Sequence, residues 1–252
     1  MKGVILAGGQ GTRLLPLTRA VNKHLLPVGG KPMLQHCVEK MVDARLEDIL
    51  VVTGGEHLGG IAEFLGSGKD FGCRVTYRVQ EAAGGIAQAL ALAEGFVSHG
   101  EPMCVLLGDN IFESSMSPLV EEYALQGFCG AMVVLKDVND PQRFGVATTD
   151  VDTTSVPRRM RITKIEEKPK NPESNHAVTG IYFYDHRVFQ IIRKCKPSRR
   201  GELEITDVNN CYVKSRLLSF VHLDGWWTDA GTHESYQMAN QLVMGVSAPP
   251  HG

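Results

Sequence analysis

The chain begins MKGVILAGGQGTRLLPLT, where a short apolar run passes at once into a loop containing Gly8, Gly9 and Gly11. Glycine tolerates positive φ angles, so a loop of this kind can turn several backbone N–H groups towards one anion. Arg13 follows with a planar guanidinium that suits phosphate oxygens, and Lys23 adds a second cation ten residues later. This combination predicts a loop that binds a triphosphate.

Two familiar glycine-rich motifs do not match this chain. In a dinucleotide fingerprint starting at Gly9, the third glycine falls on Leu14, and no acidic residue stands where the ribose contact is expected. In a P-loop read through GSGKD, Asp70 replaces the hydroxyl residue and Glu63 replaces the first glycine. The remaining alternative for the opening loop is a tight strand-to-helix turn without a ligand.

Two aspartates and one charged pair are further candidates for chemistry. Asp109 comes just after the apolar run of VLLGDN, and Asp229 lies in WWTDAGT. A divalent cation on a nucleoside triphosphate takes one or two protein carboxylates, although each aspartate alone also fits a turn or a helix cap. In EEKPKNP, Glu167 and Lys168 fit either a bound sugar phosphate or a surface charge pair.

The elements expected to position these residues alternate between strands and helices up to about residue 130. The apolar runs DILVVTG and PMCVLLGD lack alternation, as expected of strands covered on both faces. We expect an α/β fold with a Rossmann-like, mixed, mostly parallel sheet between helices, whose ligands lie beyond the carboxyl ends of the strands. The expected strands are Val4–Ala7, Ile49–Thr53, Arg74–Gln80 and Met103–Leu107, and the expected helices are Met33–Leu46, Ile61–Leu65, Ile86–Val97 and one around Leu119–Leu125.

The order changes after residue 130. GAMVVLKDV, FGVATTD, RITKIEEKP and VTGIYFYD read as strands with short connections, and Val151–Arg159 reads as an exposed turn. A helix is expected over His233–Val243. These features predict a second lobe within one domain of residues 1–252.

Composition limits the kind of protein. The net charge of −2, with 43% hydrophobic and 21% charged residues, fits a globular enzyme and argues against partners such as nucleic acid or a membrane surface. Six cysteines without a C-x-x-C pair indicate free thiols and a cytoplasmic location. No apolar run approaches the roughly 20 residues that span a bilayer.

Several motifs occur together in one order along the chain, and the similarity that they carry runs from Met1 to about Gln241. They are the opening loop, KHLLP, GGIAQAL, LGDNIF, RFGVA, EEKPKNP, AVTGIYFYD, RGELEITDVN and WWTDAGT. In this set the chain resembles the sugar-phosphate nucleotidyltransferases, and within them the short thymidylyl-transferring members that act on glucose 1-phosphate. The resemblance implies their nucleotide-diphospho-sugar transferase fold, with 1–130 binding the nucleotide, 131–232 binding the sugar phosphate and 233–252 forming a C-terminal helix and tail. It also implies that part of a regulatory site found in longer members is absent.

The reaction implied by the resemblance is attack of a glucose 1-phosphate oxygen on the α-phosphorus of dTTP, giving dTDP-glucose and pyrophosphate with Mg²⁺ as cofactor. The implied catalytic residues are Arg13, Lys23, Asp109, Lys168 and Asp229, with Mg²⁺ on Asp109 and Asp229. The implied nucleotide contacts are Leu6, Gly8, Gly9, Gly11, Thr12, Arg13, Gln80, Gly85 and Asp109. The implied sugar-phosphate contacts are Asn110, Gly145, Glu167, Lys168, Val178 and Trp227.

Two positions depart from the family pattern. His24 stands where many relatives have Gln, and Gly84 stands where several have an acidic residue. Uridylyl transfer from UTP to glucose 1-phosphate or a related sugar phosphate is therefore the alternative activity. A homologue that binds nucleotide sugar without turnover is disfavoured by the complete set of cations and aspartates, and a nicotinamide oxidoreductase is disfavoured by Leu14. Assembly into a homo-oligomer is a further expectation.

Overall fold

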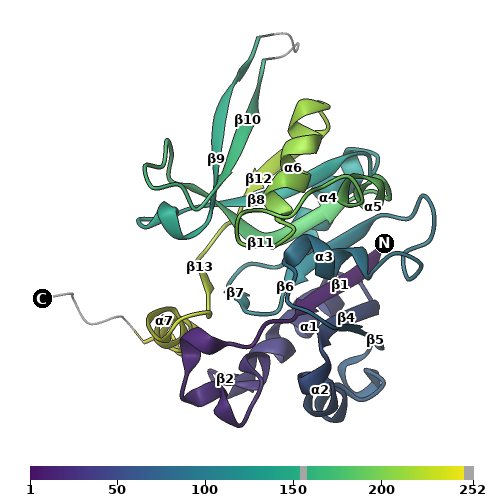
Figure 1. The fold of residues 1–252 in the computed structure, drawn as a ribbon, viewed down its shortest axis with the longest axis vertical. Helices are drawn as coiled ribbons and strands as arrows, with labels where there is room; N and C mark the ends of the chain where they lie inside the picture. Colours follow the sequence, from purple (N-terminus) through teal and green to yellow (C-terminus); the bar gives the residue numbers. More distant parts are fainter. Residues whose placement is uncertain (154–157, 247–252) are drawn as a thin grey trace, which may run out of the picture. The chain divides into compact units, whose positions relative to one another are not determined.

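The computed structural model describes residues 1–153 and 158–246 (Figure 1). These residues form two compact units that interleave along the chain. One unit, which we call the glycine-loop unit, consists of residues 2–83, 106–118 and 224–246. The other, which we call the hairpin unit, consists of residue 1 and residues 84–105, 119–153 and 158–223. The expected division of binding between 1–130 and 131–232 remains a prediction.

The glycine-loop unit contains three parallel strands, β1 (Lys2–Ala7), β4 (Asp48–Gly54) and β5 (Arg74–Gln80), with β4 between the other two. Val4 and Ile5 in β1 and the whole run 49–52 in β4 are fully buried. A parallel strand covered on both faces requires such an unbroken apolar run. The strands expected in this part of the chain are therefore confirmed.

Two helices follow these strands, α1 (Met33–Asp43) and α2 (Leu58–Leu65). The buried positions of α1 recur at helical spacing, as its amphipathic pattern predicts. The prediction that this helix reaches Leu46 is wrong by three residues. Arg45 adopts a left-handed φ of 62°, and the N–H of Leu46 donates to the carbonyl of Met41 at 2.9 Å, which ends the helix.

A short antiparallel ribbon in the same unit joins β7 (Asn110–Phe112) to β13 (Trp227–Asp229). It is followed by α7 (His233–Met244), where a helix is expected, and the Thr232 hydroxyl caps it by accepting from the N–H of Ser235 at 3.2 Å. A buried cluster ties the glycine loop to α1, β7 and α7. Its members are Leu14, Leu26, Val28, Met33, Ile111, Ala230 and Ala239.

The other regular elements of the glycine-loop unit are short. They are β2 (Pro27–Val28), β3 (Lys31–Pro32) and the 3₁₀ turns Thr12–Leu14, Leu17–Arg19, Lys23–Leu25, Gly55–His57 and Lys69–Phe71. Strand β6 (Met103–Leu107) and helix α4 (Ser117–Leu125) each begin in one unit and end in the other. Both elements lie where the sequence predicts them.

The hairpin unit contains a mixed sheet. Its strands are β8 (Ala131–Asp137), β9 (Gly145–Asp152), β10 (Arg159–Glu167), β11 (His176–Tyr184) and β12 (Leu218–His222). Strand β9 pairs antiparallel with β10 and β11, β11 pairs antiparallel with β8, and β12 runs parallel to β8. Its helices are α3 (Ile86–Ala91), α5 (Arg187–Ile192) and α6 (Ile205–Lys214), and a 3₁₀ turn covers Pro141–Arg143.

The strands expected after residue 130 are confirmed, whereas three other features differ from expectation. Helix α3 ends at Ala91 rather than Val97, and Gly95 adopts a φ of 84° in the turns that follow. Helices α5 and α6 and strand β12 were not predicted as elements. The expected turn Val151–Arg159 lies partly on residues 154–157, outside the described residues, while its ends belong to β9 and β10.

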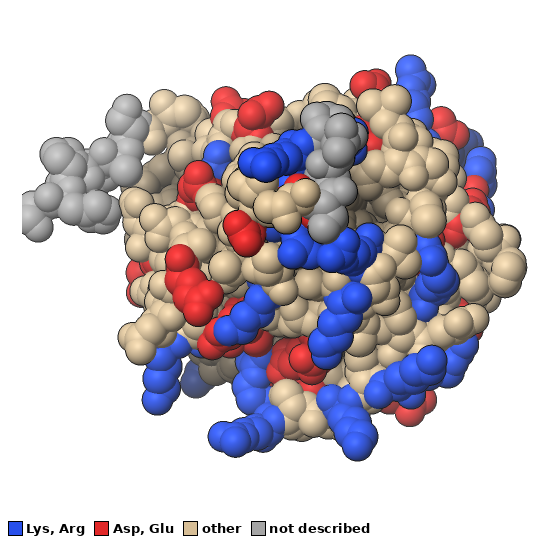
Figure 2. Space-filling view, turned by 90° about the horizontal axis from the view of Figure 1, so that it is seen from above, with Lys and Arg blue, Asp and Glu red and all other residues tan. Residues whose placement is uncertain are grey.

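Two further observations concern the charged side chains on the surface and the length of the helices. Figure 2 shows Lys and Arg side chains interspersed with Asp and Glu side chains on the face that it presents. Within residues 1–153 and 158–246, no helix combines the length and the apolarity needed to cross a lipid bilayer.

Candidate active site

The glycine loop after β1 has the backbone that only glycine adopts readily. Gly9 and Gly11 have φ angles of 94° and 64°. A Cβ atom on Gly8 would lie 2.9 Å from Oε1 of Gln80, and one on Gly11 would lie 2.9 Å from Cγ2 of Thr18. The loop therefore brings Gly8 and Gln80, both expected to contact the nucleotide, next to each other.

Asp109 and Asp229 converge through pairing of the ribbon strands. Asn110 lies opposite Asp229 in the β7–β13 register, and the N–H of Ala230 donates to the carbonyl of Asp109 at 2.8 Å. The Cβ position of Gly231, which has no side chain, marks the point of convergence. This position lies 3.3 Å from Oδ2 of Asp229 and 3.7 Å from Oδ2 of Asp109.

Arg13 reaches the same place, because its Nη2 atom lies 3.4 Å from that Cβ position. Three of the charged groups expected from sequence thus surround one glycine in the glycine-loop unit. Gly231 itself was not recognised as a functional residue. Its position in WWTDAGT, two residues after the aspartate, was the available signal.

Lys23 completes this group of charges. Its Nζ atom lies 2.6 Å from Oδ2 of Asp109, and the two side chains are only 13% and 15% exposed. The Asn110 amide donates to the other carboxylate oxygen of Asp109 at 3.1 Å. Burial opposes ionisation of Asp109, but the charge of Lys23 outweighs it and holds the pKa of this carboxyl well below its ordinary value.

Asn110 and Trp227, both expected to contact the sugar phosphate, are linked to this group. The indole Nε1–H of Trp227 donates to Oδ1 of Asn110 at 2.8 Å, and both side chains are buried. Asn110 therefore bridges the indole and Asp109, which fixes the orientation of its own amide. Leu6 is buried with its carbonyl accepting from the N–H of Gly108 at 2.9 Å, and Thr12 begins the first 3₁₀ turn.

His24 is buried beside Lys23 and is 1% exposed. Oδ1 of Asn22 lies 2.7 Å from the backbone nitrogen of His24 and 2.8 Å from its Nδ1, so both nitrogens donate to this one acceptor. The remaining ring nitrogen, Nε2, is then unprotonated in the neutral ring. Burial, reinforced by the charge of Lys23, lowers the pKa of His24 to about 3, and the ring is neutral at pH 7.

Acidification is therefore expected to destabilise the protein through His24. Between its ordinary pKa of 6.5 and its folded pKa of about 3, the unfolded chain binds a proton that the folded chain does not. The free energy of unfolding then falls as the pH falls, by up to about 1.4 kcal/mol per pH unit. In urea melts between pH 6 and pH 4.5, we expect His24→Gln to flatten this slope by about 1 kcal/mol per pH unit.

His99→Gln is the control for this measurement, because it removes an exposed imidazole. This variant should keep the wild-type dependence of the free energy of unfolding on pH. An unchanged slope in His24→Gln would contradict the assignment of His24 as a histidine that is buried without charge.

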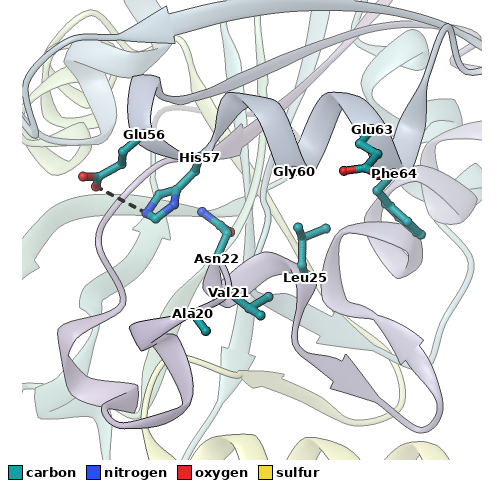
Figure 3. A pocket seen from close by; sticks show the side chains of 9 residues that line it. All are labelled: Ala20, Val21, Asn22, Leu25, Glu56, His57, Gly60, Glu63 and Phe64. Carbon is teal, nitrogen blue, oxygen red and sulfur yellow. Dashed lines mark ion pairs between the residues drawn. The ribbon is translucent and has the colours of Figure 1, made fainter.

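Asn22 also lines a pocket of about 480 Å³ (Figure 3). Asn22, Val21 and Leu25 line it from one side, and His57 and Glu63 line it from the segment that leads into and includes α2. The His57 ring nitrogen lies 3.3 Å from the carboxylate of Glu56. The residues that line this pocket include none of the expected site residues.

The expected sugar-phosphate residues of the hairpin unit also come together. Gly145 on β9 lies opposite Glu167 on β10 and opposite Val178 on β11. Oε2 of Glu167 accepts from the Thr206 hydroxyl at 2.7 Å. These strands therefore place a carboxylate beside a glycine that leaves space in front of it.

Lys168 follows Glu167 in an unusual backbone conformation. Its φ is 46°, in the left-handed region, and its N–H donates to the carbonyl of Phe144 at 2.9 Å. Nζ lies 3.5 Å from Oε1 of Glu167, and the side chain is 47% exposed. Non-glycine residues held in this region are often found at functional sites.

Arg200 and Thr206 are residues of the hairpin unit that sequence reasoning missed. The Arg200 guanidinium lies 3.5 Å from Glu167 and 2.9 Å from Glu204, so it holds the carboxylate of Glu167 together with Thr206. Both residues fall in RGELEIT, the first seven residues of the motif RGELEITDVN, and this motif was the available signal. They act as positioning residues for Glu167.

Gly85, expected to contact the base, packs against the same segment. It has a φ of 95°, and a Cβ atom there would lie 2.6 Å from the carbonyl oxygen of Leu203. At Gly84, a Cβ atom would lie 2.3 Å from the side chain of Gln88, whose Oε1 accepts from the Gly84 N–H at 3.0 Å. The acidic residue found here in several relatives would require Gln88 to move.

The carboxylates of Asp109 and Asp229 fit a hard divalent cation. Both offer oxygen ligands, which Mg²⁺ prefers, and both Oδ2 atoms face the space beside Gly231. Lys23 shares Oδ2 of Asp109, so a bound cation would have to share or displace that contact. The donor set suits Mg²⁺ better than a soft metal ion.

The chain is similar in sequence to known nucleotidyl transferases. A family model described as nucleotidyl transferase matches residues 2–244. The chain is 43% identical to a glucose-1-phosphate thymidylyltransferase of Neisseria meningitidis, over 98% of this chain and 83% of that protein. It is 41% identical to the enzyme of the same name from Xanthomonas campestris pv. campestris, over 96% of this chain and 80% of that protein.

Solved structures agree in fold. A Bacillus anthracis protein assigned as a glucose-1-phosphate thymidylyltransferase, crystallised with sucrose, is 53% identical with a TM-score of 0.89, covering 99% of this chain and 97% of that one. A UDP-glucose pyrophosphorylase, 24% identical with a TM-score of 0.82 over 95% of this chain, supports the fold alone. The expected α/β fold with a mixed, mostly parallel sheet and helices is confirmed. The chain belongs to the nucleotidyl transferase family.

Proposed function

We propose that this protein transfers a deoxythymidylyl group from dTTP to glucose 1-phosphate, with Mg²⁺ as cofactor. Several relatives at 36–43% identity carry the name of that activity, and their matches cover nearly the whole chain. The single observation that supports it most is the convergence of Arg13, Asp109 and Asp229 around Gly231, with Lys23 on Asp109. A cytoplasmic location and self-assembly remain predictions.

In the proposed reaction, a phosphate oxygen of glucose 1-phosphate forms a bond to the α-phosphorus of dTTP. The bond from that phosphorus to the oxygen bridging to the β-phosphate breaks, and pyrophosphate leaves with the bonding electron pair. No proton has to move to a protein group, so positioning and charge neutralisation are the main tasks of the protein. Mg²⁺ on Asp109 and Asp229 would neutralise charge on the triphosphate when bound.

The cations of the glycine-loop unit suit the leaving group. Arg13 and Lys23 would attract phosphate oxygens, each by about 4 kcal/mol at 4 Å and an intermediate dielectric before desolvation. The backbone N–H groups at Gly8, Gly9 and Gly11 would donate to the same phosphates. Gln80, beside Gly8, and Gly85 would contact the base.

The hairpin unit would bind the sugar phosphate. Glu167, held by Thr206 and Arg200, would accept hydrogen bonds from sugar hydroxyls. Lys168 would pair with the phosphate that carries the attacking oxygen. Gly145 and Val178, in register beside Glu167, would shape the space for the ring.

The experiment that tests this function measures pyrophosphate release for four nucleotides, dTTP, UTP, ATP and CTP, each against several sugar 1-phosphates. The proposal expects the highest kcat/KM for dTTP with glucose 1-phosphate. The highest kcat/KM with UTP would favour uridylyl transfer, the alternative left open by His24 and Gly84. Absence of turnover with every pair would overturn the proposal.

Lys168→Ala is expected to weaken use of glucose 1-phosphate selectively. Loss of one charge-assisted contact costs about 1.5–3 kcal/mol, so the KM for glucose 1-phosphate should rise about 10- to 100-fold. The KM for dTTP should change less than about twofold, because Arg13 and Lys23 are expected to bind the triphosphate. Initial rates with each substrate varied in turn measure both constants.

The matched control is Lys164→Ala, which removes an exposed lysine of β10 whose ammonium pairs with Glu166. It should leave both KM values at the wild-type level. An equal rise in the two KM values for Lys168→Ala would place this lysine outside the sugar-phosphate contacts.

A further inference from the structure

Three side chains with metal-ligating atoms meet where adjacent strands of the hairpin unit end or begin. Asp137 is the last residue of β8, His176 is the first of β11, and His222 is the last of β12. Strand β8 lies between the other two, with Asp137 opposite His176 and Leu135 opposite His222. Residues two apart on a strand face the same side, so the pairing gathers the three side chains on one face.

The ligand atoms are already close. One ligand atom from each residue lies within 4.8 Å of the other two. Nδ1 of His176 is 2.6 Å from Oδ1 of Asp137, and the ring centroids of His176 and His222 are 5.4 Å apart. Ligand atoms around a tetrahedral ion with bonds of 2.0–2.1 Å lie about 3.3 Å apart. Modest side-chain rotations would therefore bring the three ligand atoms to the distances that such an ion requires.

The surroundings allow this adjustment. Asp137 and His222 are exposed, and the His176 side chain is 30% exposed, so rotamers can change without disturbing the core. Backbone hydrogen bonds hold the strand ends in place, from Val138 N–H to the Asn175 carbonyl at 3.1 Å and from Leu223 N–H to the Leu135 carbonyl at 2.9 Å. Because the strand ends are already ordered, metal binding does not have to pay the conformational entropy that ordering a flexible loop would cost.

The donor types identify the class of ion. Two imidazole nitrogens with one carboxylate oxygen suit Zn²⁺ and similar borderline transition metals, whereas Mg²⁺ prefers oxygen ligands throughout. A Mg²⁺ ion on Asp109 and Asp229 would therefore not compete for this set. Three protein ligands leave a fourth tetrahedral position for water.

We propose that Asp137, His176 and His222 bind one divalent transition-metal ion of the Zn²⁺ class. The site is independent of nucleotidyl transfer and uses none of the residues assigned to it. The bound ion links β11 and β12 across β8. An ion that binds the folded chain but not the unfolded chain stabilises the fold, so binding raises the melting temperature.

The test titrates ZnCl₂ by calorimetry into the full-length, chelator-treated protein, with Mg²⁺ in excess to occupy hard-cation sites. The wild type should bind one equivalent of Zn²⁺. His222→Ala and Asp137→Asn should bind this equivalent about tenfold more weakly or not at all. Zn²⁺ should raise the melting temperature of the wild type but not of His222→Ala. Co²⁺ in place of Zn²⁺ should give visible absorption bands that the same variants lose.

Two controls separate this site from other Zn²⁺ ligands. His99→Ala removes another exposed histidine, and Cys129→Ser removes the exposed free thiol. Both should bind Zn²⁺ as the wild type does. Undiminished binding in His222→Ala and Asp137→Asn, or no Zn²⁺ binding by the wild type, would overturn the proposal. Pyrophosphate release by His222→Ala without Zn²⁺ should match the wild type, so failure of the proposed function would be seen separately.

Discussion

Asp109→Asn is expected to lower kcat for pyrophosphate release by about 10³-fold. The substitution replaces a negatively charged carboxylate, which would bind the metal ion, with a neutral amide. Asparagine has the same shape, so the loss reports charge rather than packing. Asp109 also faces Lys23 at 2.6 Å, and its replacement leaves that ammonium without its carboxylate partner. Initial rates at saturating dTTP, glucose 1-phosphate and Mg²⁺ measure the effect.

The control for this variant is Asp70→Asn, which makes the same chemical change at an exposed position of the glycine-loop unit. It should keep wild-type kcat. Circular dichroism should show that Asp109→Asn remains folded. Near-wild-type kcat in folded Asp109→Asn would mean that Asp109 serves only as the ion-pair partner of Lys23.

Lys23→Met is expected to lower kcat by about 10²- to 10³-fold, because the proposed function uses this preorganised charge to attract the triphosphate and the leaving pyrophosphate. A second effect follows from the Lys23–Asp109 pair. Burial raises the pKa of Asp109 and the charge of Lys23 lowers it. Removal of the lysine takes away the interaction that lowers the pKa, while the effect of burial remains. The pKa of Asp109 should therefore rise in this variant.

The pH dependence of kcat/KM measures that second effect. The proposed reaction requires ionised Asp109, so the acidic limb of the profile should move to higher pH in Lys23→Met. Lys23→Arg should restore the position of this limb, because the positive charge returns. Lys31→Met, which removes an exposed lysine paired with Glu39, should leave both kcat and the profile unchanged. A Lys23→Met profile that coincides with the wild type would contradict the coupling of the two residues.

Local sequence patterns predicted those strands and helices whose formation depends mainly on neighbouring residues. The unbroken apolar runs of β1 and β4 and the helical spacing in α1 need only neighbouring residues to be read. Helix ends were less predictable. Arg45, a residue with no special preference for φ of 62°, ends α1 because the following chain turns back towards Met41.

The sequence predicted the residue types of the candidate site but not their geometry. Glycine, arginine, lysine and aspartate beside turns indicated phosphate and metal chemistry. Lys23 and Asp109 are 86 positions apart, and nothing in either segment specifies their 2.6 Å contact. Gly231 could not be found by its chemistry, because its contribution is the space left by a missing side chain. Likewise, no recognisable metal-binding motif links Asp137, His176 and His222 in the sequence. Only strand pairing brings these three residues together.

The sequence by itself determined most of the longer strands and helices, which residues carry charge next to turns, and which family the chain belongs to. These depend on residue type, local order and the order of motifs. Tertiary structure alone decided the convergence of Arg13, Asp109 and Asp229, the neutral state of His24, and the grouping around Glu167. The physical reason is that proximity and burial are properties of strand pairing and packing between distant segments. Charge interactions and pKa values follow from those distances, and no local pattern encodes them.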